Sequence, residues 1–351
     1  MIDKKSIRIK DIAQMAGVSV GTVDRVLHGR GKVSKDAQQK VEDVLNRTGY
    51  KPNLIARTLG SNKTLKITAL LPDPAQDDYW ALAEAGILQS IEEWSYYDVE
   101  INCIFFDLYN PGSFKTTTDV VLESKPDGIL IAPVFHHESI ELLAQLKAHS
   151  IPYVLFNTNI PEADPLCFIG QNLVHSGKVA GELLSLAGGT RRTIMSLHIY
   201  ENRDNSVHLM AKEHGLRQYF QEQPYEVISL DLSTPHEVED HIREAILNPD
   251  LLGIFVTTSK GTYIVAQILE KYSLEHIRLV GYDLLEENLR YLKKGTIDFL
   301  INQNPKRMAK IGVNHLVNHL LFQKTLPEKE IFPIEIITRQ NLDSYLTSRI
   351  H

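Results

Sequence analysis

The chain has 351 residues, of which 43% are hydrophobic and 23% charged, and a net charge of −7; we expect a globular protein of two or three domains. No apolar run approaches the roughly 20 residues that span a bilayer, and the first residues lack the apolar segment of a signal peptide, so we expect neither. The two cysteines, Cys103 and Cys167, form neither a zinc pattern nor a disulfide framework, which suits a reducing cytoplasm.

The charge is distributed unevenly along the chain. Residues 1–65 contain 13 lysine and arginine residues and 6 acidic residues, a net charge of +7, whereas the remainder holds 24 and 38, a net charge of −14. A basic first segment on an acidic body favours contact of that segment with a polyanion such as nucleic acid. A solvated, lysine-rich terminus would have the same charge, so charge alone does not decide.

Residues 9–28 contain the first strong pattern. Apolar residues recur at helical spacing over 9–16, and Gly17 follows, where a helix commonly ends in a left-handed residue. The run from Gly17 to Gly21 also matches the pattern of a hydrolase nucleophile elbow, but that elbow needs a buried strand before its serine. Because a helical pattern precedes Ser19, we interpret this serine as the N-cap of a second helix.

Two further helices complete this unit. In the second helix Val23, Val26 and Leu27 form an inner stripe, which leaves positions 20–22, 24 and 25 facing outward. Ser34 is placed to cap a third helix that ends at Gly49. A helix with a capped, exposed N-terminal end is what a helix-turn-helix protein inserts into the major groove, so the pattern favours DNA binding over a three-helix packing unit without a DNA role.

A short apolar segment follows the three helices. Pro52 suits the first position of a helix, but residues 53–59 make only about two turns, too few to be stable alone in water. We expect this segment to become helical only when another surface covers it.

Residues 9–60 resemble the lactose-repressor family of bacterial transcription regulators. The matching segments are IKDIAQMAGVSVGTVDRVLHG, then VS, then VEDVLNRTGYKPNLIARTLGS. The resemblance implies a DNA-binding head, a hinge helix that pairs with its dimer mate in the minor groove, and an effector-binding domain. The length and layout of the remaining chain agree with that family.

The resemblance also implies which residues contact DNA. Val20 and Gly21 would read base edges in the major groove, with Arg25 as a further base or phosphate contact. The implied phosphate contacts are Ser19, Thr22, His28 and Ser34. The implied minor-groove contacts are Asn53, Ala56 and Leu59, the last as the wedge that unstacks the central base step.

Asp24 departs from the family pattern, which usually has a small hydroxyl residue there. Because a carboxylate repels phosphates, Asp24 either pairs with Arg25 or a nearby lysine, or accepts from a cytosine amino group; we favour the intramolecular pair. Val20 and Gly21 offer little hydrogen bonding, so specificity would depend on Arg25, the hinge and DNA shape.

From residue 66 apolar runs of strand length alternate with helical patterns. Near-continuous apolar strands indicate parallel sheets covered on both faces, and two sets of βα units suggest two lobes whose strand ends meet at one cleft. The expected strands are 66–71, 100–106, 128–133, 152–156, 193–198, 226–231, 252–257, 277–283, 297–302 and 331–339. The expected helices are 79–96, 114–125, 138–149, 173–187, 206–221, 236–247, 261–272, 285–293 and 306–322.

This body resembles the sugar-binding fold of the periplasmic binding proteins, as the family implies. The expected fold class is α/β, with a small all-α helix-turn-helix head and a two-lobed, doubly wound parallel-sheet effector domain. We expect the head at 1–51, the hinge and linker at 52–65, and the effector domain at 66–351. Lobe one would comprise about 66–168 and 303–328, and lobe two about 169–302 and 329–351.

Polar and aromatic residues after the expected strands are candidates for effector contact. Sugars present C–H faces and hydroxyl groups, so a sugar site needs aromatic platforms and bidentate polar groups. Tyr79 and Trp80 fit this chemistry, although such a pair can also be a helix start packed in the core. By the resemblance, Asp283 stands where the family often has a hydroxyl-binding carboxylate. The candidates are Tyr79, Trp80, Phe135, His136, Asn157, Asn205, Ser259, Asp283 and Gln303.

The helix around Gly215 also departs from the family pattern. Family members that bind neutral sugars often carry an arginine a few residues before the glycine matched by Gly215, and this chain has Met210 near that place. Arg203, Asn205 or His208 could take over its role, so the effector need not be a simple hexose.

Metal, cofactor and catalytic patterns have little support in the sequence. His315 and His319 have a spacing that metals accept, but the nearby asparagines are not zinc ligands, so we expect a solvated or dimer-facing pair. We find no glycine-rich phosphate loop, no dinucleotide fingerprint and no carboxylate pair for acid–base work, and therefore expect neither a cofactor nor catalysis.

These patterns favour a cytoplasmic, ligand-responsive homodimer that binds double-stranded DNA at a pseudo-palindromic operator and has no membrane partner. A carbohydrate in the cleft would shift one lobe against the other and change the pairing of the hinge segments. The expected function is transcription regulation, with repression favoured. The alternatives are a solute-binding protein for carbohydrate uptake and an α/β enzyme.

Overall fold

The computed structural model describes residues 9–28, 33–48, 64–186, 190–201, 203–245 and 247–348. The chain divides into two compact units, Met1–Asn62 and Lys63–His351, and this division falls within the expected linker. Each unit contains its own hydrophobic core. No helix of the described residues combines the length and the apolar character needed to cross a bilayer.

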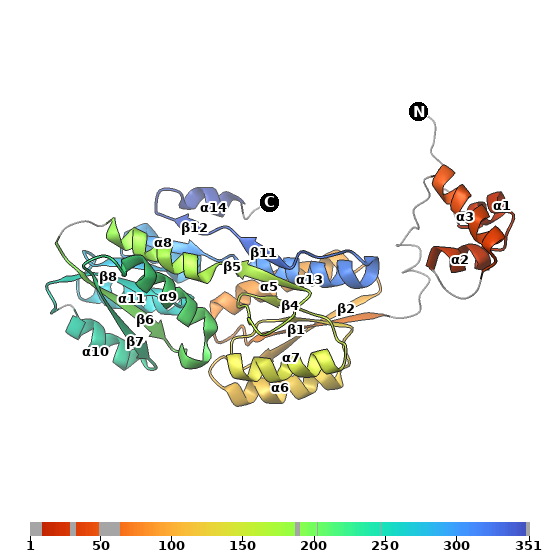
Figure 1. Cartoon of the computed structure of the whole chain (residues 1–351). Coiled ribbons are helices and arrows are strands. Elements are labelled where there is room, and N and C mark those ends of the chain that lie inside the picture. The colour runs from red at the N-terminus through yellow and green to blue at the C-terminus, as the bar shows by residue number, and fades with distance from the viewer. Residues whose placement is uncertain are drawn as a thin grey trace. The chain divides into compact units, whose positions relative to one another are not determined.

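The first unit contains helices α1 (Ile9–Ala16), α2 (Val20–His28) and α3 (Lys35–Thr48), as the sequence predicts (Figure 1). Gly17 ends α1 with a left-handed backbone at φ +65°, and the Ser19 hydroxyl accepts a 3.1 Å hydrogen bond from the Thr22 amide. The buried core consists of Ile12, Ala13, Ala16, Val23, Val41 and Val44. The predicted helix-turn-helix head is therefore confirmed.

Lobe one of the second unit contains a parallel sheet with strand order β11-β5-β4-β3-β1-β2. Helices α5 (Asp78–Trp94) and α13 (Pro305–Phe322) cover one face, and α6 (Pro111–Glu123) and α7 (His136–Ala148) cover the other (Figure 1). This double cover explains why β3 and β4 are buried along their whole length. The strands are β1 (Leu65–Pro72), β2 (Val99–Phe106), β3 (Gly128–Ile131), β4 (Tyr153–Phe156), β5 (Cys167–Gln171) and β11 (Lys329–Phe332).

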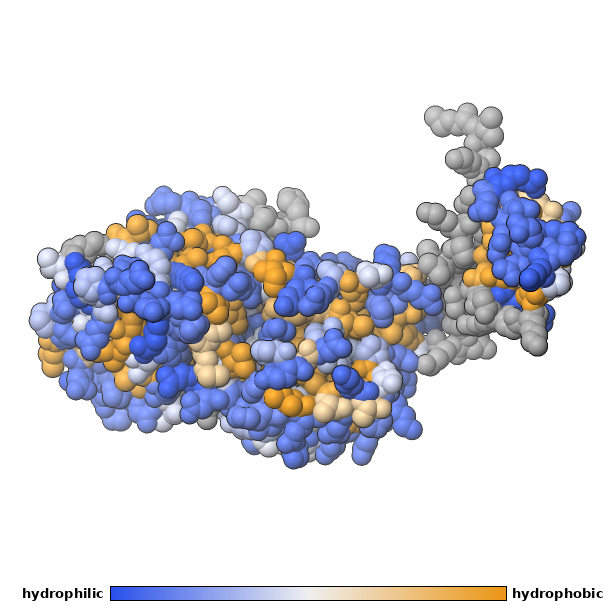
Figure 2. All heavy atoms as spheres, in the orientation of Figure 1, coloured by the Kyte–Doolittle hydropathy of each residue, from blue (hydrophilic) through white to orange (hydrophobic). Residues whose placement is uncertain are grey.

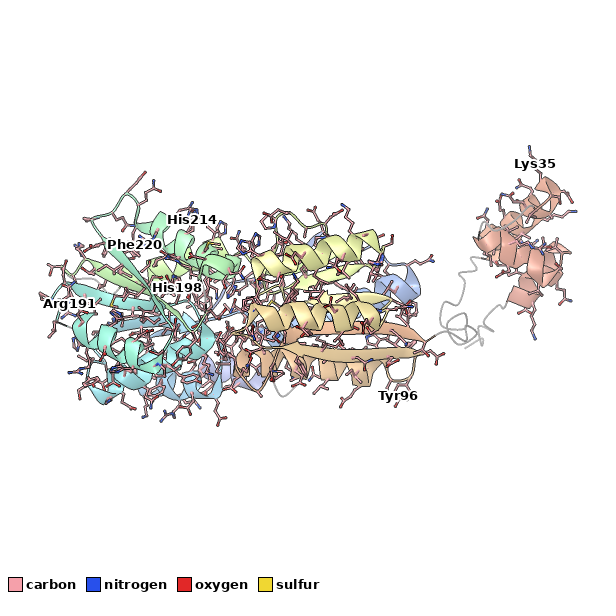
Figure 3. All side chains as sticks on the ribbon, turned by 90° about the horizontal axis from the view of Figure 1, so that it is seen from below. Lys35, Tyr96, Arg191, His198, His214 and Phe220 are labelled. Atoms are coloured by element: carbon pink, nitrogen blue, oxygen red, sulfur yellow. The ribbon has the colours of Figure 1, made fainter. Side chains whose placement is uncertain are left out.

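Lobe two repeats this order as β12-β10-β9-β8-β6-β7, with an antiparallel edge strand β12. Its strands are β6 (Thr193–Ile199), β7 (Glu226–Leu232), β8 (Leu251–Val256), β9 (Arg278–Tyr282), β10 (Phe299–Asn302) and β12 (Glu335–Ile337). Its helices are η1 (Arg203–Asn205), α8 (Leu173–Ser185), α9 (Val207–Phe220), α10 (Pro235–Ala245), α11 (Ser259–Lys271), α12 (Glu286–Lys294) and α14 (Leu342–Ser348). One core cluster includes residues of α8 and α9, among them Phe220 (Figure 3), and another includes residues of α10, α11 and α12.

The described chain passes between the lobes at three places: from β5 to α8, from β10 to α13, and from β11 to β12. The buried side chain of Gln171 ties them together, because its Nε2 donates to the carbonyls of Asn302 and Pro333 at 2.8 Å each. Each crossing therefore contributes one group to a single hydrogen-bonded point.

The structure corrects the lobe boundaries expected from the sequence. Residues 169–171 and 329–332 belong to the sheet of lobe one, not to lobe two, because β5 and β11 pair in parallel there. The strand β5 and the helix α14 were not expected. The single strand expected at 331–339 is two strands in different sheets, with Pro333, which has no N–H to donate, between them.

The surface of the second unit is mostly hydrophilic on the face shown in Figure 2, where apolar side chains are scattered rather than gathered in one continuous patch. Scattered apolar residues of this kind are normal on a globular protein. The concave site between the lobes therefore has to be identified from its lining and not from surface hydropathy.

We predict that Gly177→Ala destabilises lobe two more than Gly181→Ala on the same helix. A Cβ on Gly177 would lie 1.9 Å from the Lys212 carbonyl oxygen of α9, whereas a Cβ on Gly181 would meet the Tyr219 ring at 2.8 Å. A ring can move and a helix backbone cannot, so we expect a loss of about 1–3 kcal/mol for Gly177→Ala and less for Gly181→Ala. Urea unfolding measures both; equal losses would contradict this account.

Candidate effector-binding cleft

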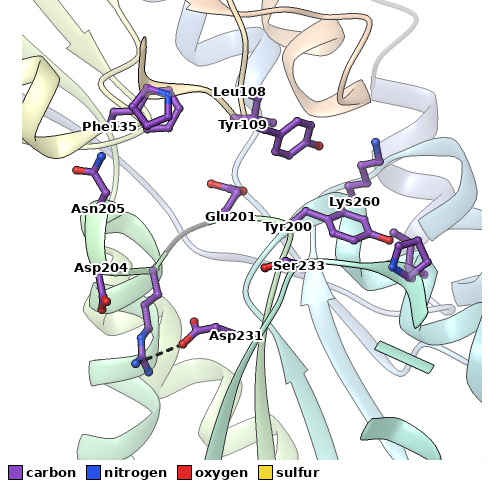
Figure 4. A pocket seen from close by; sticks show the side chains of 14 residues that line it. Leu108, Tyr109, Phe135, Tyr200, Glu201, Asp204, Asn205, Asp231, Ser233 and Lys260 are labelled. Atoms are coloured by element: carbon purple, nitrogen blue, oxygen red, sulfur yellow. Dashed lines mark ion pairs between the residues drawn. The ribbon is translucent and has the colours of Figure 1, made fainter. Parts of the chain in front are cut away.

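The carboxyl ends of the strands of both sheets meet at a cleft between the lobes. Its outer part is a cavity of about 880 Å³. Figure 4 shows Glu201 near the middle of this cavity, with Tyr109 and Lys260 to one side and Asn205 to the other. The lining residues are Leu108, Tyr109, Pro111, Phe135, Tyr200, Glu201, Arg203, Asp204, Asn205, Asp231, Ser233, Pro235, Lys260 and Ile264.

A second, inner cavity of about 30 Å³ shares Glu201 with the outer one. Its volume is about that of one water molecule. The lining residues are Asp77, Tyr79, Trp80, Asn157, Glu201, His208, Lys212, Thr257, Thr258, Ser259 and Gln303. The two cavities together form a site with a roomy mouth and a narrow end.

Several residues at the ends of the strands have left-handed backbones although they are not glycine. Asn157, Tyr200 and Asp283 directly follow β4, β6 and β9, and Asn304 follows β10, with φ between 60° and 69°. Such conformations cost on the order of 1–3 kcal/mol each and persist only where surrounding contacts hold them. Their concentration here marks the strand ends as a functional region.

The aromatic pair at the start of α5 belongs both to the core and to the inner cavity. Tyr79 and Trp80 are only 5% and 4% exposed, and their rings meet edge to face at 4.9 Å. The Tyr79 hydroxyl donates to Asn157 Oδ1 at 2.7 Å, and the Tyr79 amide donates to Asp77 Oδ1 at 2.8 Å. The Asp77 cap thus holds the start of α5, and the hydrogen bond to Asn157 fixes the hydroxyl end of the Tyr79 ring at the cavity wall.

Asp283 is fully buried and anchors the end of lobe two. Its carboxylate accepts from Ser259 Oγ at 2.6 Å, and from the backbone N and the Nε2 of Gln303 at 2.7 Å each. Burial raises the pKa of Asp283, although these hydrogen bonds and Lys212 act to lower it. The carboxylate therefore holds the end of β9, the start of α11 and the crossing at 303 together.

Lys212 is the cation nearest to this anchor. Its Nζ donates to the Thr257 carbonyl at 2.8 Å and lies 3.7 Å from the centroid of the Tyr282 ring. Burial lowers the pKa of Lys212 to about 8, while Asp283 and Glu201 act to raise it. Lys212 is therefore held as part of the wall of the inner cavity.

Glu201 reaches into the cleft from lobe two and is hydrogen-bonded to His208 Nε2 at 2.9 Å. Burial acts to raise the pKa of Glu201, but His208 and Lys212 outweigh it and the pKa is lowered. On lobe one, burial and the nearby Glu201 raise the pKa of Asp77 to about 7. The inner cavity thus has a carboxylate with a lowered pKa on lobe two, Glu201, and a carboxylate with a raised pKa on lobe one, Asp77.

Polar contacts join the two lobes at the mouth of the cleft. Lys260 of α11 donates to the Gln76 carbonyl at 2.7 Å. Asn205 of η1 donates to Glu138 at 2.9 Å and accepts from the His137 amide at 3.1 Å. These contacts hold the described structure in an arrangement with the lobes together.

The residues expected from the sequence are not all brought to the same place. Tyr79, Trp80, Asn157, Ser259 and Gln303 line the inner cavity, whereas Phe135 and Asn205 line the outer one. Asp283 lies behind the wall with no exposed surface.

His136 was expected in the site and lines neither cavity. It is the first residue of α7, where its Nε2 lies 4.0 Å from Glu162 and its ring packs against that of His137. The helix begins immediately after the strand-end loop, so its first residue turns away from the cleft.

Important cavity residues were missed, chiefly Glu201, Lys212, Tyr109 and Tyr200. Three of these follow β2 or β6, so the strand-end rule applied to every strand would have found them. Lys212 stands three residues before Gly215, on the helix in which we expected a substitute for an arginine. Met210, which departs from the family pattern, is 41% exposed and lies outside both cavities.

In the head, α2 presents the expected outward face. Val20, Gly21 and Arg25 are exposed, and Thr22 is half-buried with its hydroxyl 2.9 Å from Ser19 Oγ. Ser34 accepts from the Ala37 amide at 3.3 Å, which confirms it as the cap of α3. The side chain of His28, and Asn53, Ala56 and Leu59, lie outside the described residues.

His315 and His319 on α13 each have a protein partner. His315 Nε2 lies 2.7 Å from Glu330, and His319 Nδ1 lies 3.0 Å from the Lys324 carbonyl. Among the residues that the structure describes, no three histidine, cysteine or acidic side chains gather as a metal site would require.

Comparison with known proteins identifies both units. The periplasmic binding protein domain matches residues 68–324, and the DNA-binding domain of the bacterial regulatory proteins of the lacI family matches residues 8–53. A crystal structure from Bacteroides fragilis, described as a candidate LacI transcriptional regulator, is 31% identical, with a TM-score of 0.75, over 81% of this chain and 100% of that chain. The chain belongs to the LacI family of bacterial regulatory proteins.

Named relatives of this LacI-family protein are transcription regulators. The sucrose operon repressor of Streptococcus mutans is 24% identical over 95% of this chain and 99% of its own length. The regulator DegA of Bacillus subtilis is 31% identical over about half of each chain, 51% and 52%. GanP, a glucose-galactose binding protein of Geobacillus stearothermophilus, shares the fold of the body at 21% identity and a TM-score of 0.71, over 80% of this chain and 99% of its own. A LacI-family DNA-binding domain on the body favours regulation over the solute-uptake alternative.

We predict that Asp77→Asn stabilises the body at neutral and higher pH. The pKa of Asp77 is about 7 in the folded body and ordinarily 3.8. Between about pH 4 and pH 7 the unfolded chain loses this proton while the folded body keeps it, so the free energy of unfolding falls as pH rises. Asparagine keeps the cap acceptor without the charge. The melting temperature of the variant should exceed that of the wild type at about pH 8 and converge with it toward about pH 4. Asp78→Asn, which neutralises the exposed carboxylate of the next residue, is the control.

We also predict that Asn205→Ala combined with Lys260→Met shifts the empty body toward an open arrangement, because it removes the polar contacts across the mouth. The radius of gyration from small-angle scattering should increase. Asn248→Ala is the control, since its 3.3 Å contact with Thr193 lies within lobe two. An unchanged radius in the double variant would contradict a role for these contacts in holding the lobes together.

Proposed function

We propose that this LacI-family regulator binds a pseudo-palindromic operator as a homodimer, represses transcription there, and releases or retains DNA according to a carbohydrate bound between its lobes. The observation that carries the proposal is the presence in one chain of a helix with an exposed, capped N-terminal end and a cleft formed by the strand ends of two sheets. The first reads DNA in known folds and the second binds small ligands.

The surface of α2 supports DNA recognition. Arg25 is exposed and can form a bidentate contact with guanine, while Val20, 50% exposed, and Gly21 can contact base edges only by shape and apolar packing. Two identical heads on a dimer would read two half-sites related by a two-fold axis. Specificity would then combine one strong polar contact with DNA shape.

The chemistry of the cleft supports a carbohydrate. Aromatic side chains from both lobes, Tyr109, Tyr200 and Phe135, alternate around the outer cavity with charged and amide groups. Such a lining suits a ligand with apolar C–H faces and a ring of hydroxyl groups. A volume of about 880 Å³ is sufficient for a sugar of one or two rings.

The coupling between ligand and DNA requires two arrangements of the lobes with different ligand affinity. The hydrogen-bonded crossing point at Gln171 would act as the hinge, and the contacts of Lys260 and Asn205 would be made only in the closed arrangement. By linkage, a ligand that weakens DNA binding must itself bind less tightly when the protein is on DNA.

The proposal is tested by selecting DNA sequences from a random pool with the full-length protein and measuring affinity at several salt concentrations. Affinity should fall steeply and linearly on logarithmic axes, by a slope of about 0.9 per phosphate neutralised. Arg25→Ala should weaken binding by about 1–3 kcal/mol and relax specificity at one base position of each half-site. Lys40→Ala removes the same charge from α3, where Lys40 pairs with Asp36 at 2.6 Å, and should have little effect. No enriched sequence, or a flat salt response, would overturn the proposal.

A further inference from the structure

The charges around the inner cavity indicate a chemical class of effector, an inference that rests on the function proposed above. Carboxylates approach the cavity from both lobes: Asp77 from lobe one, Glu201 from lobe two, and Asp283 behind the wall. Closing the lobes therefore brings Asp77 and Glu201 toward one another. A positively charged group between these two carboxylates would favour closure of the lobes.

The cations of the cleft are already engaged with the protein. Lys212 donates to the Thr257 carbonyl and lies over the Tyr282 ring, and Lys260 donates to the Gln76 carbonyl. Arg203, at the outer cavity, pairs with Glu213 at 3.2 Å and with Asp231 at 3.4 Å (Figure 4). A phosphate or carboxylate on the ligand would share these cations with their protein partners and would meet the carboxylates of Glu201 and Asp77 as well.

Two polar atoms at the inner cavity have no hydrogen-bond partner among the described residues. Asp77 Oδ1 accepts from the Tyr79 amide, and among the described residues Asp77 Oδ2 has no hydrogen-bond partner. His208 is 7% exposed, its Nε2 contacts Glu201, and its Nδ1 is buried without a partner in the described structure. The open end of the site therefore calls for a donor-rich group.

The volumes of the two cavities indicate which part of a ligand each can hold. The inner cavity, at about 30 Å³, admits a group the size of water and not a ring, whereas the outer cavity, at about 880 Å³, admits rings. An ammonium group is compact and has three donors and no acceptor. Glu201 borders both cavities, so a ring in the outer cavity can carry such a group into the inner one.

We propose that the effector is an amino sugar whose protonated amine occupies the inner cavity between Asp77 and Glu201, with its ring in the outer cavity. The site then discriminates against sugar phosphates and uronates, and binds neutral sugars less tightly than their amino counterparts. The amine also couples recognition to closure, because it contacts a carboxylate of each lobe. Since burial holds the Asp77 pKa near 7, the bound amine lowers that pKa and releases a proton from the protein at about pH 7.

The test is titration calorimetry on the full-length protein at about pH 7, with glucosamine, galactosamine and mannosamine. Each is compared with its parent hexose, its N-acetyl derivative, its 6-phosphate and the matching uronate. The expected result is an amino sugar that binds at least about tenfold more tightly than its neutral parent and N-acetyl form, with an observed enthalpy that depends on the ionisation enthalpy of the buffer.

Asp77→Asn should remove the preference for the amine and the proton release, while the matched control Asp78→Asn, an exposed carboxylate one residue along, should keep both. The proposal is overturned if no amino sugar is preferred over its parent, if a phosphate or uronate binds more tightly, or if Asp77→Asn keeps the preference. Operator binding measured in parallel distinguishes failure of this inference from failure of the proposed function. Intact DNA binding without amine preference removes only this inference, whereas loss of sequence-specific DNA binding removes the proposed function itself.

Discussion

The structure of the body depends on one buried amide. Gln171 Nε2 donates to carbonyls of the two other segments that pass between the lobes, so that all three crossings meet at one hydrogen-bonded point. Loss of this side chain would remove a hydrogen bond from the carbonyl of the buried Asn302, and leaving a buried acceptor unpaired typically costs about 1–3 kcal/mol. In the described part of the chain the backbone passes between the lobes at this edge, whereas the opposite edge is joined by side-chain contacts such as those of Lys260 and Asn205. The opposite edge can therefore open, and the strand ends of both sheets face the same cleft. The site is a consequence of that constraint.

The two buried aspartates on either side of the cleft show how similar groups take different roles. Asp283 accepts three hydrogen bonds and lies near Lys212; these contacts oppose the burial that raises its pKa, and the carboxylate serves as an anchor. Asp77 accepts one hydrogen bond from its own helix, and its pKa is raised to about 7. A carboxylate with a raised pKa at the edge of a cavity is a candidate for contact with a ligand. The difference lies in the number of donors supplied by the fold, since both residues are buried.

The head and the body use charge and packing in opposite ways. The head lies in a segment with a net positive charge, which suits contact with a polyanion. Its core has only six buried apolar residues among those described, so its free energy of unfolding is expected to be small. The acidic body has large cores on both sides of two parallel sheets, and close helix contacts such as that of Gly177 with the Lys212 carbonyl. The body is therefore the unit stiff enough to convert a ligand contact into a change of lobe arrangement.

The sequence alone determined the three helices of the head, the alternation of strands and helices, and most strand-end candidates. These are local properties: apolar spacing, caps at Ser19 and Ser34, and the position of a residue after a strand. Only the tertiary structure decided that β5 and β11 pair in lobe one, that His136 turns away from the cleft, and that Lys212 enters it. Those outcomes depend on which strands lie side by side and on how far the two lobes close. A pattern within a short segment of the chain carries no information on either, because both involve residues far apart in the sequence.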